Sequence, residues 1–255
     1  MVLSAFGYLR EKKSMTNTVI VPMRSGSKGI KNKNIREFVN LPLYYWSLKK
    51  LYNLSCIGKV NKIIVSSDND WYLDRVKTSF SFMKEETLIL SKRPDYLSTD
   101  VVTTEEVCIH ELEKHGINDG IVSIIEVTSP LIPVESLSLM FSAIDEGTYS
   151  SFLVYPDVGQ YWRCNKGNDY KWEKLYSDRK MRQKENEILY KEVGAWSIRV
   201  DVFKEYKNRI VEPCMPIVID KEYGLSINTE DDFVNAEYLI KEYSPQIFKE
   251  LGIYT

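Results

Sequence analysis

Basic side chains that directly follow an apolar strand offer the clearest chemistry in the sequence. The β-branched run Val19–Val21 has the length of a buried strand and leads into the loop RSGSKG, residues 24–29, with Lys33 and Arg36 close behind. A small-residue loop exposes backbone N–H groups that bind phosphate, and Arg and Lys add charged donors. Because open α/β sheets bind ligands at the carboxyl ends of their strands, this segment predicts a polyphosphate site. The alternative is a solvated basic loop after an edge strand.

The composition argues against a nucleic-acid or membrane-surface role. The 255 residues include 34 basic and 36 acidic side chains, which gives a net charge of only -2. No run of 18 apolar residues could span a membrane, and the first residues lack the order of a signal peptide. The four cysteines are far apart and form no CxxC pair, so we expect reduced, mostly buried thiols in a cytoplasmic protein. They are Cys56, Cys108, Cys164 and Cys214.

The order of apolar segments predicts one α/β domain. Strands alternate with helices along most of the chain, which favours a mostly parallel sheet with right-handed crossovers. Strands are expected at 62–67, 88–90, 120–127, 150–155, 193–198 and 216–219, and helices at 41–55, 70–80, 99–115, 135–146, from about 200, at 229–243 and at 245–251. Met15 resembles a natural start, so residues 1–16 are expected to be a poorly ordered extension of a domain spanning 17–255.

The regular pattern changes over residues 156–192. Aromatic side chains such as Trp162 and Trp172 alternate there with charged and amide residues. Stacking on single-stranded nucleic acid is one interpretation. The balanced charge favours another, an inserted β-hairpin arm that buries its aromatics against a second copy of the chain. We therefore predict a homodimer that binds neither nucleic acid nor membrane.

Polar residues gather in the loops that follow the predicted strands. They are Arg24, Ser27, Lys28, Lys33, Asn34, Asp68, Arg93, Thr128, Ser129 and Asn228. His110 and His115 both lie on a predicted helix, and no P-loop, GxGxxG or Ser-His-Asp pattern is present. Several cations with one carboxylate suited to a metal, and no evident covalent nucleophile, indicate phosphoryl or nucleotidyl transfer by positioning and charge neutralisation.

The segment Ile20–Ile35 carries a family resemblance. It is similar to the R-x-x-S-K-G-x-x-x-K-N signature of bacterial CMP-sialic acid synthetases (acylneuraminate cytidylyltransferases) and, more distantly, of CMP-Kdo synthetases. Five further blocks follow in the same order: IVSSDND, RPDYLSTDVVTTEEV, VTSPLI, VGAWSI and SINTEDDF. The resemblance extends from about Val19 to Tyr243.

This resemblance implies a fold and an activity. The fold is a Rossmann-like, three-layer nucleotidyltransferase fold with an inserted dimerisation arm at 156–192. The activity is transfer of CMP from CTP to an acidic, nonulosonate- or Kdo-like sugar with release of pyrophosphate, assisted by Mg²⁺, in surface-polysaccharide synthesis.

The resemblance also implies roles for individual residues. Arg24, Lys28 and Lys33 are the expected catalytic cations, which hold the triphosphate. The expected nucleotide site comprises Met23, Arg24, Ser25, Gly26, Ser27, Lys28, Gly29, Asn34, Arg93, Val102 and Thr104. The expected acceptor site comprises Glu126, Thr128 and Ser129, and the expected magnesium ligands are Asp68 and Asn228.

Five positions depart from the family pattern. Ser226 and Asn228 replace the two aspartates of a D-x-D motif, which removes two negative charges from the expected metal site. Glu126 stands in place of Gln, Ile132 in place of Arg, and Val193 in place of Asn. The acceptor is therefore left open. A catalytically silent homologue that binds nucleotide or a partner is one alternative, and a transferase using another nucleoside triphosphate or a non-sugar acceptor is another.

Overall fold

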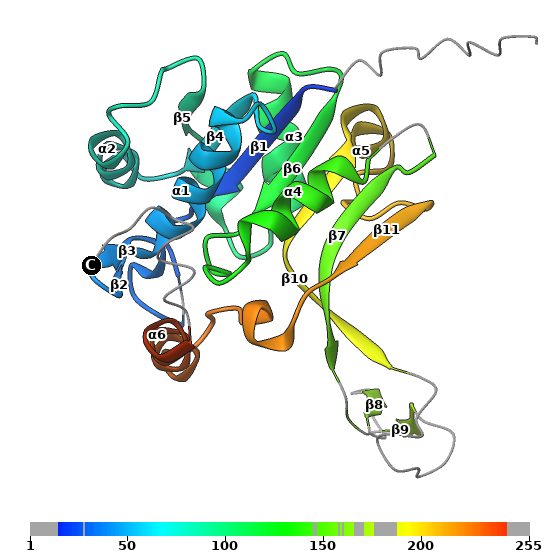
Figure 1. The fold of residues 1–255 in the computed structure, drawn as a ribbon. Helices are drawn as coiled ribbons and strands as arrows, with labels where there is room; N and C mark the ends of the chain where they lie inside the picture. Colours follow the sequence, from blue (N-terminus) through cyan, green and yellow to red (C-terminus); the bar gives the residue numbers. More distant parts are fainter. Residues whose placement is uncertain are drawn as a thin grey trace, which may run out of the picture.

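The computed structural model describes residues 15–27, 29–144, 147–157, 159, 161–165, 171–175 and 188–243. A central seven-stranded sheet has the strand order β11-β7-β10-β6-β1-β4-β5. Helices cover both of its faces, so the domain has three layers (Figure 1). This confirms the expected three-layer α/β fold.

The sheet is mostly parallel. Its strands are β1 (Asn17–Pro22), β4 (Lys62–Ser67), β5 (Leu88–Lys92), β6 (Ile121–Ile125), β7 (Ser150–Asp157), β10 (Leu189–Arg199) and β11 (Cys214–Val218). β1 pairs in parallel with both β4 and β6, and β4 with β5, whereas β10 is antiparallel to its neighbours β6 and β7. Strand β1 therefore has neighbours on both sides, which explains its continuous apolar run.

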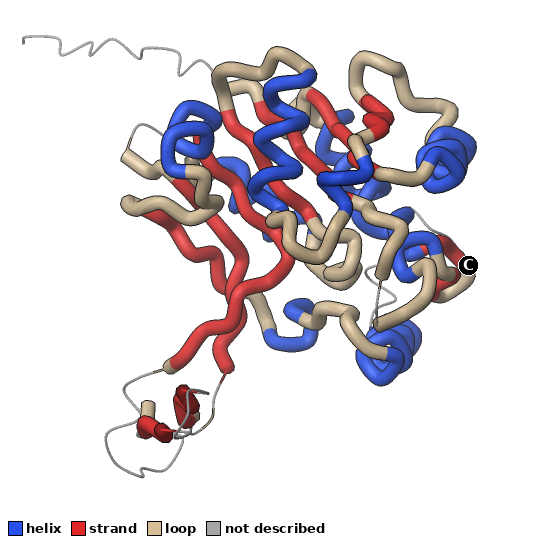
Figure 2. Tube along the Cα trace, turned by 180° about the vertical axis from the view of Figure 1, so that it is seen from behind, coloured by secondary structure: helices blue, strands red, loops and turns tan. Residues whose placement is uncertain are grey.

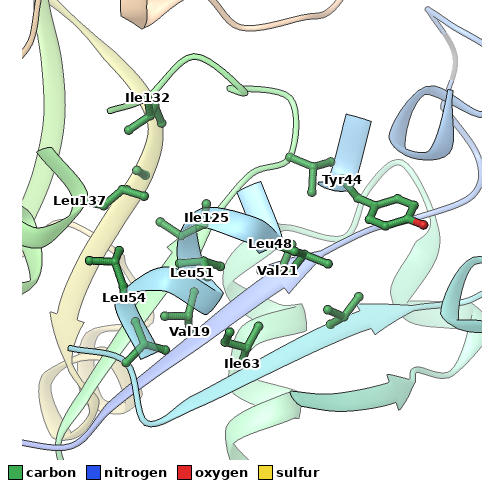
Figure 3. Close-up of a cluster of buried hydrophobic side chains, with 14 of the residues drawn as sticks. Val19, Val21, Tyr44, Leu48, Leu51, Leu54, Ile63, Ile125, Ile132 and Leu137 are labelled. Atoms are coloured by element: carbon green, nitrogen blue, oxygen red, sulfur yellow. The ribbon is translucent and has the colours of Figure 1, made fainter. Parts of the chain in front are cut away.

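Two apolar cores lie on the two faces of the sheet. Helices α1 (Leu43–Cys56), α2 (Asp70–Ser79) and α4 (Val134–Ser142) pack on one face, and α3 (Thr104–Lys114) and α5 (Val200–Tyr206) on the other. In α1, Tyr44, Leu48 and Leu51 recur on one side and are fully buried against β1 (Figure 3). Helix α6 (Glu230–Tyr243) instead packs on the short ribbon of β2 (Glu37–Phe38) and β3 (Leu41–Pro42), away from the sheet.

The observed bounds agree with the expected ones within a few residues for most elements. The helix expected from residue 99 begins at Thr104, because Thr103 and Glu106 form a reciprocal capping box that fixes its start. The strand expected at 193–198 begins at Leu189, because its ladder with β7 continues outward to the Leu189–Asp157 pair. The helix expected at 245–251 and residues 1–14 lie outside the described residues.

An extension of β7 and β10 projects from the body of the domain (Figures 1 and 2). A separate antiparallel hairpin, β8 (Trp162–Asn165) with β9 (Lys171–Lys174), lies beyond it. The side chains of Trp162 and Trp172 are 53% and 64% exposed. An arm is therefore present where the sequence predicted one, and its role in dimerisation stays a prediction.

The cysteines are unpaired, as expected, but they are not mostly buried. Only Cys108 is buried, Cys56 is exposed, and Cys164 and Cys214 are intermediate. The expectation failed because three of them lie on a helix end, a hairpin and an edge strand rather than in the core. Within the described residues, no helix combines the length and the apolar character needed to cross a bilayer.

Candidate active site

A pocket of about 460 Å³ opens where the parallel strands end. Pro22 closes β1, Arg93 follows β5 and Glu126 follows β6, so side chains from three strand ends meet in one place. The first turns of α3 and the segment before α6 complete the wall. The lining residues are Pro22, Arg24, Ser27, Gly29, Lys33, Asn34, Arg93, Leu97, Thr99, Asp100, Val102, Thr103, Thr104, Val107, Glu126, Val127, Thr128 and Asn228.

Asp68 holds the loop that follows β1. Its Oδ1 accepts a hydrogen bond from the backbone N–H of Ser25 at 2.9 Å, and its Oδ2 accepts one from the Ser25 hydroxyl at 2.6 Å. Burial alone would raise the pKa of Asp68, but the hydrogen bonds from Ser25 and the nearby Arg93 guanidinium outweigh it and lower this pKa. On the other side of the loop, the Asn34 amide donates to the carbonyl oxygen of Arg24 at 2.9 Å. The loop is therefore fixed from two directions before any ligand binds.

Three cations face the pocket. Arg93 is only 3% exposed; its Nε donates to Ser98 Oγ at 2.9 Å and its guanidinium lies 4.0 Å from Asp68. Lys33 Nζ donates to the carbonyl oxygen of Ile227 at 2.7 Å. Burial lowers the pKa of Lys33, partly opposed by the carboxylate of Glu126. Three positive groups on one wall make this end of the pocket an anion site.

The remaining cation, Arg24, is tied to a pocket carboxylate. Its Nη1 lies 3.0 Å from Asp100 Oδ1, and both side chains are more than a third exposed. An exposed pair of this kind contributes about 0–1 kcal/mol to stability. Arg24 is thus placed at the mouth of the pocket, where an anionic ligand competes with Asp100 for it.

A buried carboxylate lies behind the cations. Glu111 of α3 is fully buried and accepts hydrogen bonds from Ser66 Oγ and Ser91 Oγ, both at 2.6 Å. It thereby joins α3 to β4 and β5, the two strands that lead into Asp68 and Arg93. Sequence reasoning missed this group, because the three residues belong to no common motif and meet only in the folded sheet.

Another part of the wall combines Glu126 and Thr128 with a close approach of β10. The backbone N–H of Glu126 donates to the Gly194 carbonyl at 2.8 Å. A side chain at Gly194 would meet Ser129 Oγ at 2.7 Å and Glu126 Cβ at 2.9 Å. Ser129 Oγ is buried and has no hydrogen-bond partner within the described part of the chain. This wall is held by tight backbone packing rather than by ion pairs.

The segment before α6 closes the pocket against the loop after β1. A methyl group at Gly29 would overlap the carbonyl oxygen of Asn228, so the two backbones are in direct contact. The Ile227 N–H donates to the Thr128 carbonyl at 2.8 Å. Asp232 Oδ2 accepts from the backbone N–H groups of Asn228 and Thr229 at 3.0 and 2.9 Å, which caps α6.

Most of the expected site residues line this pocket. They are Arg24, Ser27, Gly29, Lys33, Asn34, Arg93, Val102, Thr104, Glu126, Thr128 and Asn228. Ser25, Gly26, Asp68 and Ser129 do not line it, Met23 is fully buried in the core, and Lys28 lies outside the described residues. Sequence reasoning missed the pocket-lining Asp100, whose block RPDYLSTD carried the signal but was interpreted as the start of a helix.

Two of the departures from the family pattern lie in the core. Ile132 and Val193 are 1% and 2% exposed and belong to the apolar cluster under α1, α2 and α4 (Figure 3 labels Ile132). Neither lines the pocket, whereas Glu126 and Asn228 do. The difference in the site is therefore concentrated at Glu126 and at the 226–228 segment.

The oxygen donors on the wall fit a magnesium ion that arrives with a triphosphate. No group of three His, Cys, Asp or Glu side chains suited to hold a metal occurs among the described residues. A nucleotide-bound Mg²⁺ takes most of its ligands from phosphates and water and needs only one or two protein oxygens, which Asp100 and Asn228 can supply. Asp68 as a metal ligand stays a prediction, and it requires exchange of the hydrogen bonds from Ser25.

Comparisons with known proteins agree with this geometry. Residues 18–191 match the family model described as cytidylyltransferase. The chain is 23% identical over 243 residues to the N-acylneuraminate cytidylyltransferase of Streptococcus agalactiae, an alignment that covers 91% of this chain and 57% of that protein. It therefore spans little more than half the length of these streptococcal relatives. It is also 23% identical over 237 residues to the pseudaminic acid cytidylyltransferase of Campylobacter jejuni, with 89% and 97% covered.

A solved structure shows the same fold. The structure of CMP:2-keto-3-deoxy-manno-octonic acid synthetase complexed with CTP superposes with a TM-score of 0.62 at 13% identity, over 89% of this chain and 99% of that chain. At this identity the likeness concerns the fold, and it confirms the nucleotidyltransferase-like architecture expected from the sequence.

Proposed function

The chain belongs to the cytidylyltransferase family, and on that basis we propose that it transfers CMP from CTP to an acidic sugar and releases pyrophosphate. The observation that carries the proposal is the meeting of Arg24, Lys33 and Arg93 in one pocket with a loop fixed by Asp68. The described wall supplies cations and oxygen donors, which favours direct transfer by positioning and charge neutralisation.

The reaction needs charge stabilisation more than bond chemistry from the protein. The acceptor oxygen forms a bond to the α-phosphorus, and the bond from this phosphorus to the oxygen bridging to the β-phosphate breaks. The electron pair leaves on pyrophosphate, which Arg24, Lys33 and Arg93 face from the loop side of the pocket. A positioned donor at a developing charge contributes about 2.7–4 kcal/mol to lowering a barrier, or 10²–10³-fold in rate. Lys28 shares this role in the proposal.

The nucleoside is proposed to lie against the α3 side. Leu97, Val102 and Val107 supply apolar surface there, and Thr104 supplies a hydroxyl in the first turn of the helix. An apolar wall with a few polar groups is the usual form of a small-molecule site. The N-terminus of α3 also favours negative charge nearby.

Magnesium would be held by Asp100, Asn228 and the triphosphate in this proposal. When bound, it neutralises phosphate charge and makes pyrophosphate a better leaving group. The replacement of two family aspartates by Ser226 and Asn228 lowers the negative charge available, so the ion is expected to depend on the nucleotide for most of its affinity.

The acceptor side is proposed to be Glu126, Thr128 and Ser129. The relatives named for N-acylneuraminate and pseudaminic acid support an acidic sugar acceptor. A role in surface-polysaccharide synthesis is a further part of the proposal. The exposed Trp162 and Trp172 support a homodimer formed through the arm.

The test is pyrophosphate release from CTP and Mg²⁺ with N-acetylneuraminate, pseudaminate, legionaminate and Kdo as acceptors. Release with one acid, and weaker release when UTP or GTP replaces CTP, is the expected result. CTP binding without release across the panel would contradict the proposal and favour a silent homologue. Sedimentation of the chain and of a Trp162→Asp, Trp172→Asp variant tests the dimer separately.

A further inference from the structure

Glu126 is a carboxylate on the proposed acceptor side of the pocket, with one long hydrogen bond among the described residues. It directly follows β6 and lines the pocket, and the remainder of its side chain is enclosed by the protein. The hydrogen bond described for its carboxylate is a long one, 3.4 Å from Thr128 Oγ1 to Oε2. A carboxylate so placed is available to a ligand.

The other ionisable groups on the described wall are committed elsewhere. Asp100 is paired with Arg24, and Arg93 is held by Ser98 and Asp68. Lys33 donates to the Ile227 carbonyl and belongs to the cationic side. Glu126 is therefore the described wall group that can take a proton from the acceptor.

Two cations partly offset the effect of burial on the pKa of Glu126. Burial raises the pKa of Glu126, while Arg209, the Thr128 hydroxyl and Lys33 lower it, and Glu105 raises it slightly. Burial is the largest of these influences, so the pKa of Glu126 lies above its ordinary value, and a raised pKa makes a carboxylate a stronger base. Arg209 does not line the pocket, so it can be replaced to change the pKa of Glu126 without removing a group from the pocket wall.

Arg209 is itself held firmly. Its guanidinium makes two hydrogen bonds to Glu105 of α3, at 2.5 and 3.0 Å, and stacks on Trp196 of β10 at 4.4 Å. These contacts hold the Arg209 cation in one position, from which its charge acts on Glu126. Gly194 packs against Glu126 Cβ from the same strand as Trp196, which fixes the position of the carboxylate.

We propose that Glu126 is the general base of the transfer, held by the packing of Gly194 on its Cβ, and that Arg209, fixed by Glu105 and Trp196, is a positive charge that acts on it. In the step, the O–H bond of the acceptor breaks and its proton passes to a carboxylate oxygen of Glu126. The oxygen electron pair forms the bond to the α-phosphorus, and the departing electron pair leaves on pyrophosphate. After release of the products, Glu126 returns the proton to water. The inference rests on the proposed cytidylyl transfer.

The experiment measures the pH dependence of kcat for pyrophosphate release with the acceptor that supports turnover. The variants are Glu126→Gln, Glu126→Asp and Arg209→Gln, with Glu135→Gln as a matched control on the exposed first turn of α4.

Glu126→Gln should lower kcat by about 10²–10⁴-fold and abolish the acid limb, because the amide cannot accept the proton. The Kd of this variant for CTP should stay within about twofold of the wild-type value, because Glu126 is not proposed to bind the nucleotide. Glu126→Asp should restore part of the rate.

The Arg209→Gln variant tests whether Arg209 acts through its charge. A purely structural role would not shift the acid limb of the pH dependence of kcat. Protonated Glu126 is inactive, so the wild-type rate falls as the pH drops through its pKa. Loss of the Arg209 cation raises this pKa, and the acid limb should therefore shift to higher pH. Glu135→Gln should match the wild type throughout.

Two results would overturn the inference while leaving the proposed function intact. One is a Glu126→Gln variant with more than half of the wild-type kcat. The other is an acid limb that persists unchanged in Glu126→Gln or does not move in Arg209→Gln. Absence of pyrophosphate release from the wild type with every acceptor would instead overturn the proposed function, and with it this role.

Discussion

The two sides of the pocket are held together by different means. On the cationic side, loops after neighbouring parallel strands are joined by charged hydrogen bonds, as between Asp68 and Ser25. On the proposed acceptor side, Glu126 is held by backbone packing against Gly194. The first arrangement depends on charged side chains, and the second depends on close packing of two backbones. Substitutions that change only charge or only volume should therefore separate the two sides.

Removal of a cation should give the largest effect. Lys33→Met keeps most of the side-chain volume but removes the charge that faces the triphosphate, and kcat/KM for CTP should fall by about 10²–10³-fold. Steady-state pyrophosphate release measures this. Lys31→Met is the control, because Lys31 is an exposed cation in the same segment that does not line the pocket. An equal loss of kcat/KM in both variants would show that the total positive charge of the segment, and not the position of Lys33, determines the effect.

An added methyl group at Gly29 should come next. It would overlap the Asn228 carbonyl oxygen and push the segment before α6 away from the pocket, with a loss of about 10²-fold in kcat/KM for CTP. The matched change Gly26→Ala meets no atom within 4 Å and should leave the melting temperature unchanged. A Gly29→Ala variant with wild-type kinetics would show that this segment does not close the site.

A methyl group at Gly194 should affect the acceptor alone. It would meet Ser129 Oγ at 2.7 Å and Glu126 Cβ at 2.9 Å, so the acceptor wall must shift. We expect KM for the acceptor to rise about tenfold, roughly the 1–3 kcal/mol cost of overpacking, with the Kd of CTP unchanged. Titration of CTP by calorimetry, beside acceptor kinetics, checks the separation. A loss of CTP affinity in the same variant would show that the two sides of the pocket do not bind their ligands independently.

The smallest expected effect is that of Ser25→Ala on stability. Loss of the hydroxyl bond to Asp68 should lower the free energy of unfolding by about 1 kcal/mol at pH 7. The pKa of Asp68 is lowered in the folded state, so its stabilising contribution is present above the unfolded pKa of about 3.9 and is lost as the pH falls through the folded value. The difference between wild type and variant should therefore shrink towards pH 3. Urea unfolding at several pH values tests this, and a difference independent of pH would exclude Asp68 as its origin.

The contrast between the two sides also explains what the sequence could predict. β4 was expected over the residues it occupies, and the cationic loop was expected as a site, because apolar runs and glycine-containing loops are local signals. The roles of Asp100, Glu111 and Arg209 were missed, since each depends on contacts between elements distant in the chain. The antiparallel direction of β10 was also not predicted, because the order of strands and helices along the chain does not determine how each strand pairs. A buried Ile132, where the family pattern has an arginine, was visible as a departure but its place in the core was not.

The bond from Lys33 to the Ile227 carbonyl joins residues 194 positions apart. During synthesis on the ribosome, the loop that follows β1 therefore emerges long before the segment that completes the pocket. A nascent chain shorter than about 228 residues has the cations but lacks the Asn228 backbone that packs on Gly29. Closure of the pocket therefore requires the chain as far as the segment before α6, and a product that ends before this segment carries the family signature without a closed site.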